Sequence, residues 1–199
     1  MPQFDLRGIK IAKYVNTNGV ITYTDRQSAG DAMTANLELR FAEGRLYAES
    51  TLAEYLRKCV GGTISLGVKY IPAAAQQLMF GVKTKTRAVS YTPEGGSATS
   101  VNAESLVTGR KTTGAYVGVG FYAPDMVDGA EKYTAVKIAR AMFGQPTMSL
   151  QTAGENIQFS TPVTNGEFLA DHSNAGDLLE VAVLDDEEAA AAWVDAVLA

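Results

Sequence analysis

The sequence predicts a mainly β protein with a β-sandwich or barrel-like core, a short helix after a central strand and a second helix at the C-terminus. Apolar and polar residues alternate along several segments, as they do in strands with one buried face. Many of the 19 glycines stand beside β-branched or aromatic residues, which is typical of strands joined by turns. About seven or more such strands indicate a sandwich or barrel, and a chain of 199 residues suits a single domain, 1–199.

The N-terminal part is expected to hold a hairpin and the clearest strand of the chain. Residues 8–15 and 19–24 are apolar-rich runs separated by Asn16-Thr17-Asn18, and Asn tolerates the left-handed backbone angles of a tight turn. From residue 33 to residue 41 every second residue is apolar. After a glycine, residues 45–50 are expected to return antiparallel to that strand.

Residues 51–60 fit either a short helix or an irregular strand, because apolar residues recur there at helical spacing between flanks that read as extended. Residues 62–70 alternate aliphatic side chains and are expected to form a central strand. A helix of about two turns should follow. Pro72 can occupy its first turn, residues 73–79 favour helix, and Gly81 can end it in a left-handed conformation.

Residues 82–111 predict a long projecting loop or a flexible hairpin. Basic residues bracket a stretch rich in Ser, Thr and Gly, and these basic residues are Lys83, Lys85, Arg87, Arg110 and Lys111. A compact domain rarely keeps so long an excursion without a use for it, so the five are candidates for contact with a partner. The alternative is a mobile surface loop without such a role.

Four further strands are expected, at residues 112–123, 133–143, 155–163 and 178–184. The first two should form a hairpin, because residues 124–132 between them contain Asp128-Gly129, which is a strong turn signal. Asn165-Gly166 offers a turn near the third strand.

The C-terminal residues predict an amphipathic helix that packs on the sheets. Asp185 can cap this helix, Glu188 completes a capping-box-like pattern, and Leu184 can act as the hydrophobic staple. Residues 189–198 are helix-forming. The side chains expected on the packing face are Ala190, Trp193, Val194 and Val197.

Composition and charge disfavour several classes of protein. A net charge of -5 and a pI near 4.9 argue against tight binding of nucleic acid, which needs concentrated Lys and Arg. No segment approaches the roughly 20 apolar residues that span a bilayer, and residues 1–15 lack the apolar core of a signal peptide. Cys59 is the only cysteine, so an intramolecular disulfide is excluded, and we expect a small buried hydrophobe there.

No catalytic or metal-binding motif stands out, so we expect no enzyme, no cofactor and no metal site. The only histidine, His172, lies among Asp171, Ser173 and Asn174, where a solvated loop is expected rather than a catalytic base. One histidine also excludes two-His zinc sites, and no G-x-S-x-G serine motif accompanies it. Carboxylates from distant strands could still converge as they do in glycosidases.

Three stretches taken together resemble the major tail proteins, or tail tube proteins, of bacteriophages with long non-contractile tails. They are GGTISLGV at 61–68 running into Pro72 and LMFG at 78–81, then GVGFY at 118–122, then EEAAAAWV at 187–194. The similarity extends from about residue 46 to the end of the chain and includes 133–143 followed by 151–161. Residues 82–111 depart most from the family pattern.

The resemblance implies a structural virion protein whose subunits close into six-membered rings and stack into a hollow tail tube. The implied partners are further copies of the chain, the tape-measure protein, the tail terminator and the distal tail proteins. DNA would pass through the lumen without specific binding, and no membrane is involved. The implied location is the virion, after assembly in the host cytoplasm. The five basic residues of 82–111 then become candidate contacts between rings, complementary to an acidic surface such as the C-terminal region.

Two other functions stay open at this stage. One is a carbohydrate- or cell-surface-binding β-sandwich module, because exposed Tyr and Trp on such folds bind sugars or partners, although Trp193 is expected on a packing face. The other is the tube protein of a contractile or secretion device, which would share the ring architecture and differ in having a sheath partner.

Overall fold

The computed structural model describes residues 5–127, 129–147, 161–173 and 175–199. As the sequence predicts, the protein is mainly β, with antiparallel sheets, a short helix after a central strand and a C-terminal helix. The strands are β1 (Arg7–Thr17), β2 (Val20–Ser28), β3 (Ala32–Ala48), β4 (Thr51–Val68), β5 (Lys83–Tyr91), β6 (Thr99–Val107), β7 (Val117–Val127), β8 (Ala130–Phe143), β9 (Val163–Leu169) and β10 (Leu179–Leu184). The helices are α1 (Ala73–Phe80) and α2 (Glu187–Val197).

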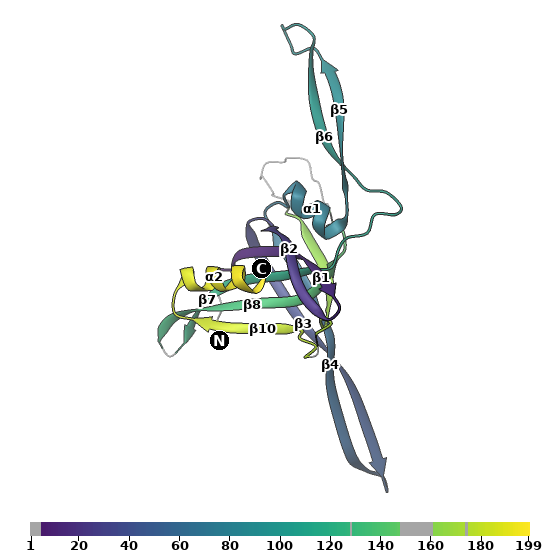
Figure 1. The fold of residues 1–199 in the computed structure, drawn as a ribbon, viewed down its shortest axis with the longest axis vertical. Helices are drawn as coiled ribbons and strands as arrows, with labels where there is room; N and C mark the ends of the chain where they lie inside the picture. The colour runs from purple at the N-terminus through teal and green to yellow at the C-terminus, as the bar shows by residue number, and fades with distance from the viewer. Residues whose placement is uncertain (1–4, 128, 148–160, 174) are drawn as a thin grey trace, which may run out of the picture.

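One antiparallel sheet forms the body of the molecule (Figure 1). Its strand order is β2-β1-β7-β8-β9-β4-β3, and β10 also pairs with β8. β8 therefore has β7 along one edge, while β10 and β9 follow one another along the other edge. β1 and β2 form the expected hairpin, and Asn18 and Gly19 in its turn have φ angles of 53° and 87°.

The core lies between β1, β4, β7, β8 and β9, whereas the alternating apolar residues of 33–41, the clearest strand in the sequence, are mostly exposed in the single chain. Ile64, Leu66 and Val68 of β4 are buried, as their spacing predicts. They pack in one cluster with apolar residues of β1, β7, β8 and β9, including Ile138 and Phe168. Burial of each large side chain stabilises the fold by about 1.5–3 kcal/mol, so this cluster holds the body together.

The expected helix after the central strand is confirmed, and α1 closes one end of the core with the buried Met79 and Phe80. Pro72 precedes the helix as its N-cap residue. Gly81 ends the helix with a φ of 67°. A Cβ at this position would lie 2.1 Å from the carbonyl oxygen of Thr113, so both the backbone angle and the space require glycine.

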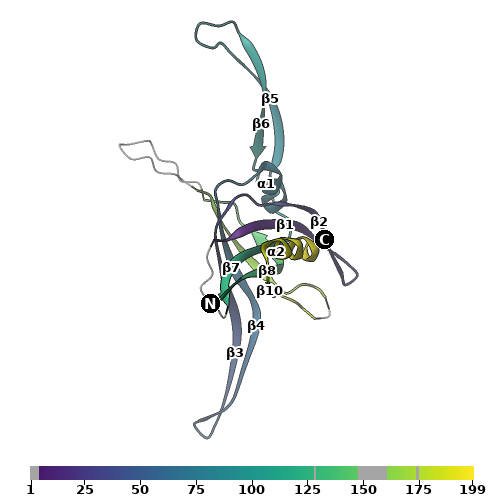
Figure 2. The same ribbon diagram turned by 90° about the vertical axis from the view of Figure 1, so that its left-hand side faces the viewer.

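The C-terminal helix α2 lies across the outer face of β7 and β8 (Figure 2). Ala190 and Val194 are buried against these strands. Gly120 of β7 permits the close approach, because a Cβ there would lie 2.8 Å from Cγ1 of Val194. The partly buried residues around this contact include Leu184, Trp193 and Val197.

The N-cap of α2 is one residue later than expected. Asp186, not Asp185, accepts a hydrogen bond from the backbone N–H of Ala189 at 2.7 Å. Asp185 instead pairs with Lys132 of β8, and this contact lowers the pKa of Asp185. With Asp186 as the cap, Ala189 stands three positions on, so the expected capping-box-like pattern of Asp185 with Glu188 is not formed.

β3 and β4 form one long hairpin, which corrects the expected return strand at 45–50. β3 continues through Gly44, which pairs with Leu56. The chain reverses at Glu49 and Ser50, whose φ angles are 49° and 65°. Residues 51–60, for which helix and strand were both open, belong to β4. Gly44 was the stronger local turn signal, but continuous pairing between the two strands overrides it.

Three other boundaries differ from the expectation. β7 begins at Val117 rather than at residue 112, and it continues through Pro124, so its hairpin with β8 is tighter than 124–132 would allow. Asn165 and Gly166 lie inside β9, where both pair with β4, and not in a turn. Of the expected strand 155–163, residues 155–160 lie outside the described residues, and β9 starts at Val163.

Val194→Ala should destabilise the body by about 1–3 kcal/mol, because it removes two methyl groups from the buried contact between α2 and Gly120. Ala192→Ser on the exposed side of the same helix is the matched control and should change the free energy of unfolding by less than about 0.5 kcal/mol. Urea unfolding of both variants measures the difference. Equal stabilities would mean that α2 does not depend on this contact.

Candidate assembly surfaces

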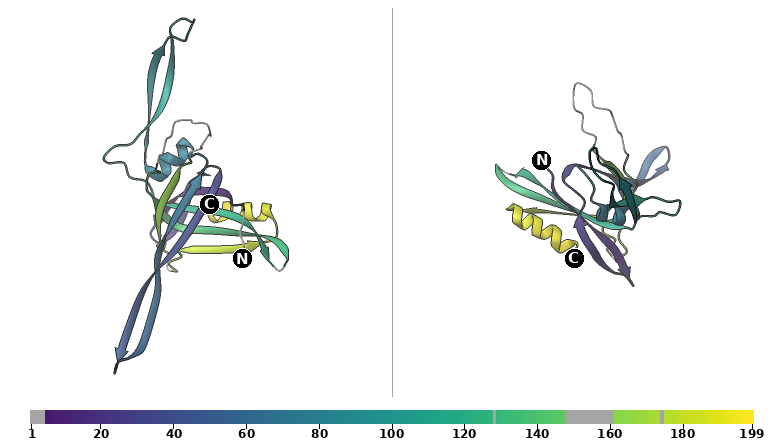
Figure 3. Two further views of the ribbon diagram at one scale, coloured as in Figure 1. Left: turned by 180° about the vertical axis from the view of Figure 1, so that it is seen from behind. Right: turned by 90° about the horizontal axis from the view of Figure 1, so that it is seen from above.

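Two ribbons of two strands each project from opposite ends of the body (Figures 1 and 3). The β3–β4 arm comprises residues 40–61, beyond the part of β4 that pairs with β9. The β5–β6 arm comprises residues 83–107, and its strands form a separate two-stranded sheet. A two-stranded ribbon buries little apolar surface and is at best marginally stable by itself in water. Both arms are therefore candidates for contact with a partner.

The two faces of the β3–β4 arm differ in composition. Opposite residues of an antiparallel pair lie on the same face, so the register defines each face. The aromatic face consists of Phe41, Glu43, Arg45, Tyr47, Leu52, Tyr55, Arg57 and Cys59. The leucine face consists of Ala42, Leu46, Glu54, Leu56 and Lys58. Leu46 and Leu56 are 58% and 72% exposed, which makes the leucine face a candidate interaction surface.

Charged side chains order the aromatic face. Glu43 lies 3.4 Å from Arg45 and 3.6 Å from Arg57. A hydrogen bond to Glu43 also raises the pKa of Tyr55. The guanidinium of Arg57 lies 3.9 Å from the centroid of the Phe41 ring, within the range of a cation–π contact. These contacts give the aromatic face defined side-chain positions in the single chain.

The β5–β6 arm carries its basic residues on one face. Lys83, Lys85 and Arg87 occupy alternate positions of β5, so their side chains share a face with Val89 and Tyr91. We call this the basic face. Among the described residues none of these three cations takes part in an ion pair. Their charge is available to a partner.

The five basic residues predicted as a contact do not form one cluster. Lys83, Lys85 and Arg87 stand together on the basic face. Arg110 and Lys111 lie in a turn after the end of β6. Basic residues at 83, 85 and 87 alternate in the sequence. They were not placed on one face because the segment was expected to be a loop or flexible hairpin and not a regular strand.

Three of the four acidic residues at the start of α2 already have partners within the chain. Asp185 pairs with Lys132, and Asp186 caps the helix. Glu187 lies 2.6 Å from Arg7. This arrangement makes the C-terminal region a weaker candidate for the acidic partner of the basic face than its sequence suggested.

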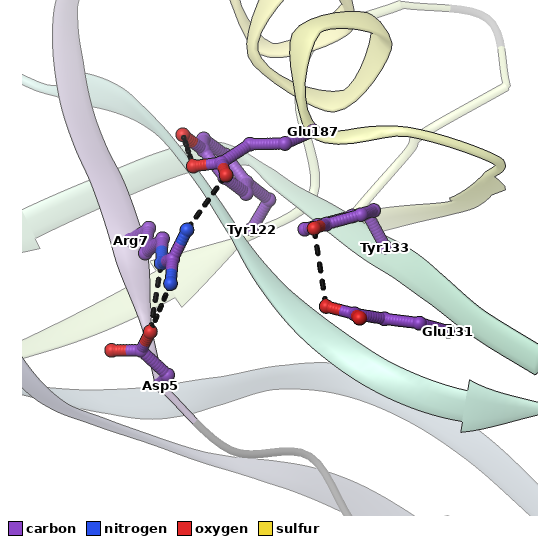
Figure 4. A network of polar contacts seen from close by, with 6 residues as sticks. All are labelled: Asp5, Arg7, Tyr122, Glu131, Tyr133 and Glu187. Atoms are coloured by element: carbon purple, nitrogen blue, oxygen red, sulfur yellow. Dashed lines mark hydrogen bonds and ion pairs between the residues drawn. The ribbon is translucent and has the colours of Figure 1, made fainter.

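Figure 4 shows how Glu187 ties the N-terminal segment to α2. Arg7 of β1 donates to Glu187 at 2.6 Å and, through Nε, to Asp5 at 2.8 Å. Tyr122 of β7 also donates to Glu187, at 3.1 Å. The hydrogen bond from Arg7 is the main cause of a lowered pKa at Glu187, and the two carboxylates raise the pKa of Arg7.

A shallow hollow of about 790 Å³ lies over β3, β4 and β9. Its polar lining residues are Asn36, Glu38, Thr63, Ser65, Asn165 and Glu167. Within the described part of the chain no Lys or Arg lines it, although Arg40 reaches Glu167 at 3.3 Å near its margin. Glu38 and Thr63 pair across β3 and β4 on the same side as the leucine face, and Arg40 and Lys58 lie between them at the root of the arm, outside the hollow. Such a lining does not favour phosphate binding.

The residues considered for chemistry do not assemble a site. His172 is exposed, with Nδ1 3.0 Å from the Tyr14 hydroxyl and Nε2 2.6 Å from Arg140. Cys59 lies half-buried on the β3–β4 arm and not in the core, which corrects the expectation of a buried hydrophobe. In the described ranges no group of three His, Cys, Asp or Glu side chains could hold a metal ion.

No helix among the residues that the structure describes is long and apolar enough to cross a membrane. Comparison with protein families finds no family that matches this chain. Comparison with curated proteins finds no match either.

Glu187→Gln should lower Tm at pH 7 and lose this effect in acid. The pKa of Glu187 is held below its ordinary value of 4.5, chiefly by Arg7, so ionised Glu187 stabilises the folded chain above that value. The contribution is lost as the pH falls through the folded pKa. Thermal unfolding at several pH values from 7 to 3 measures the difference in Tm between the original chain and the Glu187→Gln variant.

Glu188→Gln is the matched control for this experiment, because Glu188 is exposed and lies in the same first turn of α2. Its Tm should stay closer to that of the original chain across the pH range. A Glu187→Gln deficit that persists unchanged at pH 3 would contradict the role given to the ion pair with Arg7.

Proposed function

We propose that the chain is a structural subunit of a phage tail, which self-assembles into stacked rings that form the hollow tail tube for DNA delivery. The observation that carries the proposal is the pair of arms at opposite ends of one compact body. Each arm exposes apolar side chains that the chain itself does not cover, including Leu56 and Tyr91. A partner that covers them would stabilise ribbons that are marginal alone.

The placement of the arms favours a stack over a closed dimer. Contacts made by two different surfaces at opposite ends are heterologous, and they repeat from copy to copy along an axis. β2 and β3 are the terminal strands of the sheet path, so their outer edges offer lateral contacts that could close a ring. The six-membered ring itself rests on the resemblance to tail tube proteins.

The polar hollow supports the assignment of a lumen-facing surface. Its lining is neutral or acidic, with Glu38 and Glu167 as its charged members. DNA that moves through a tube must not be held by Lys or Arg, because each neutralised phosphate adds affinity. We assign the face of β3, β4 and β9 that carries this hollow to the lumen.

A second candidate, a glycan-binding module, draws on one surface cluster. The guanidinium of Arg140 lies 4.9 Å from the centroid of the Tyr116 ring and 5.9 Å from that of Tyr14, and His172 lies beside it. Tyr116 is exposed and Tyr14 half-buried, and such rings offer a ligand an apolar face beside a polar hydroxyl. This function requires a monomer with saturable binding and no polymer, so the assembly experiment separates the two candidates.

The purified chain should form hollow rings or tubes in negative-stain electron microscopy as its concentration rises. A variant in which Asn-Gly replaces residues 43–57 should remain folded and lose this assembly. The replacement joins Ala42 to Lys58, which are paired, through a turn of a length that hairpins favour. None of the buried apolar residues of the core is removed, so Tm should stay within about 3 °C of the original value.

The matched control alters a different hairpin without shortening it, at the end of β1 just before the turn at Asn18 and Gly19. Substitution of Asn16 and Thr17 by Gly and Ser there should leave assembly intact. Persistent monomers of the original chain, with no polymer at any concentration or with its tail partners co-expressed, would overturn the proposed function.

A further inference from the structure

We propose that the β3–β4 arm of one copy lies antiparallel along the β5–β6 arm of the next copy, with the acidic tip of each arm against the basic root of the other. This inference rests on the proposed function, because it names the surface that one ring offers to the next. Two features of the chain support it: charge is distributed unevenly along each arm, and the arms leave the body at opposite ends (Figure 1).

The β3–β4 arm has opposite charge at its two ends. Its distal residues, 46–56, contain two acidic side chains, Glu49 and Glu54, and no basic one. Its root, residues 40–45 and 57–61, contains four basic side chains against one acidic. The charged residues of the root are Arg40, Arg45, Arg57, Lys58 and Glu43. The tip therefore has a formal charge of -2 and the root +3.

The β5–β6 arm repeats this polarity. Its root carries Lys83, Lys85 and Arg87 on the basic face, while Glu104 of the root lies on the opposite face, across from Thr86. Its distal residues, 88–102, contain Glu94 as their one charged side chain. Each arm is thus basic where it leaves the body and acidic where it ends.

When copies stack head to tail along the long axis, the acidic tip of each arm faces the basic root of the arm from the next copy. The arms leave the body at opposite ends, so an arm of one copy and the other arm of the next copy overlap in opposite directions (Figure 1). The tip of each arm then meets the root of the other, which places Glu49 and Glu54 beside Lys83, Lys85 and Arg87. Complementary charges fix the register of such a contact.

Apolar side chains accompany the charges on the faces that would meet. The leucine face carries Leu46 and Leu56 next to Glu54. The basic face carries Val89 and, across from it, Val101, both more than two-fifths exposed. Two ribbons packed face to face would bury these side chains in a small four-stranded layer, which neither ribbon forms alone. The occupant of each arm is therefore a second copy of this chain.

A charge exchange between the arms tests the inference. Glu49→Lys with Glu54→Lys reverses the acidic tip, and Lys83→Glu, Lys85→Glu and Arg87→Glu reverse the basic face. Each set alone should raise the concentration needed for assembly by about tenfold or more, because like charges then meet. The two sets combined should return it to within about threefold of the original value, since opposite charges meet again. Sedimentation with electron microscopy gives the concentration.

Glu104→Lys, on the other face of the β5–β6 arm, is the matched control and should shift the assembly concentration by less than about twofold. All of the substituted side chains are exposed, Glu49 at the turn between β3 and β4 and the others on strands. Circular dichroism with thermal unfolding verifies that each variant is folded. If the original chain assembles but a reversal has no effect, or the combined variant is not restored, the inference is wrong and the proposed function stands. If the original chain never assembles, both fall.

Discussion

The body depends on one strand, β8, that is packed on both faces and paired on both edges. Val136 and Ile138 point into the core, while Ala135 lies under α2. The contact between the sheet and α2 needs small residues. Val194 packs so close to Gly120 on the neighbouring strand β7 that no Cβ would fit at position 120. The two layers are therefore coupled through β8, and a change in its register would displace the core and the helix together.

This coupling concentrates the stabilising contacts in the body and leaves the arms outside them. Every side chain of β5 is exposed, and so is almost every side chain of β3–β4 beyond the pairing with β9. The arms thus add exposed apolar surface without adding to the core. In a monomer such an exposed apolar surface promotes aggregation. In a subunit that assembles, the same surface is buried against the next copy.

The sequence pattern predicted those elements that depend on neighbouring residues alone. The alternation of Ile64, Leu66 and Val68 and the left-handed Gly81 follow from side-chain period and backbone angle. The turn at Glu49 and Ser50 was missed, because neither residue is a strong turn signal and the reversal is imposed by the pairing of two long strands. Contacts such as Arg7 with Glu187, 180 positions apart, depend on the completed fold. The basic face could be read from its period of two only after the segment was known to be a strand.

The continuity of β3 and β4 links the two surfaces that the proposed function requires. The same strands line the hollow within the body and form the arm beyond it, so Glu38 and the leucine face lie on one side of the same ribbon, with Arg40 between them. A shift of register between Arg40 and Phe41, at the root of the arm, is the place where the direction of the ribbon can bend. A partner held on the leucine face is consequently placed in line with the hollow. The strands β3 and β4 would then both make the contact between successive subunits and align their hollows. No separate element would be needed for either task.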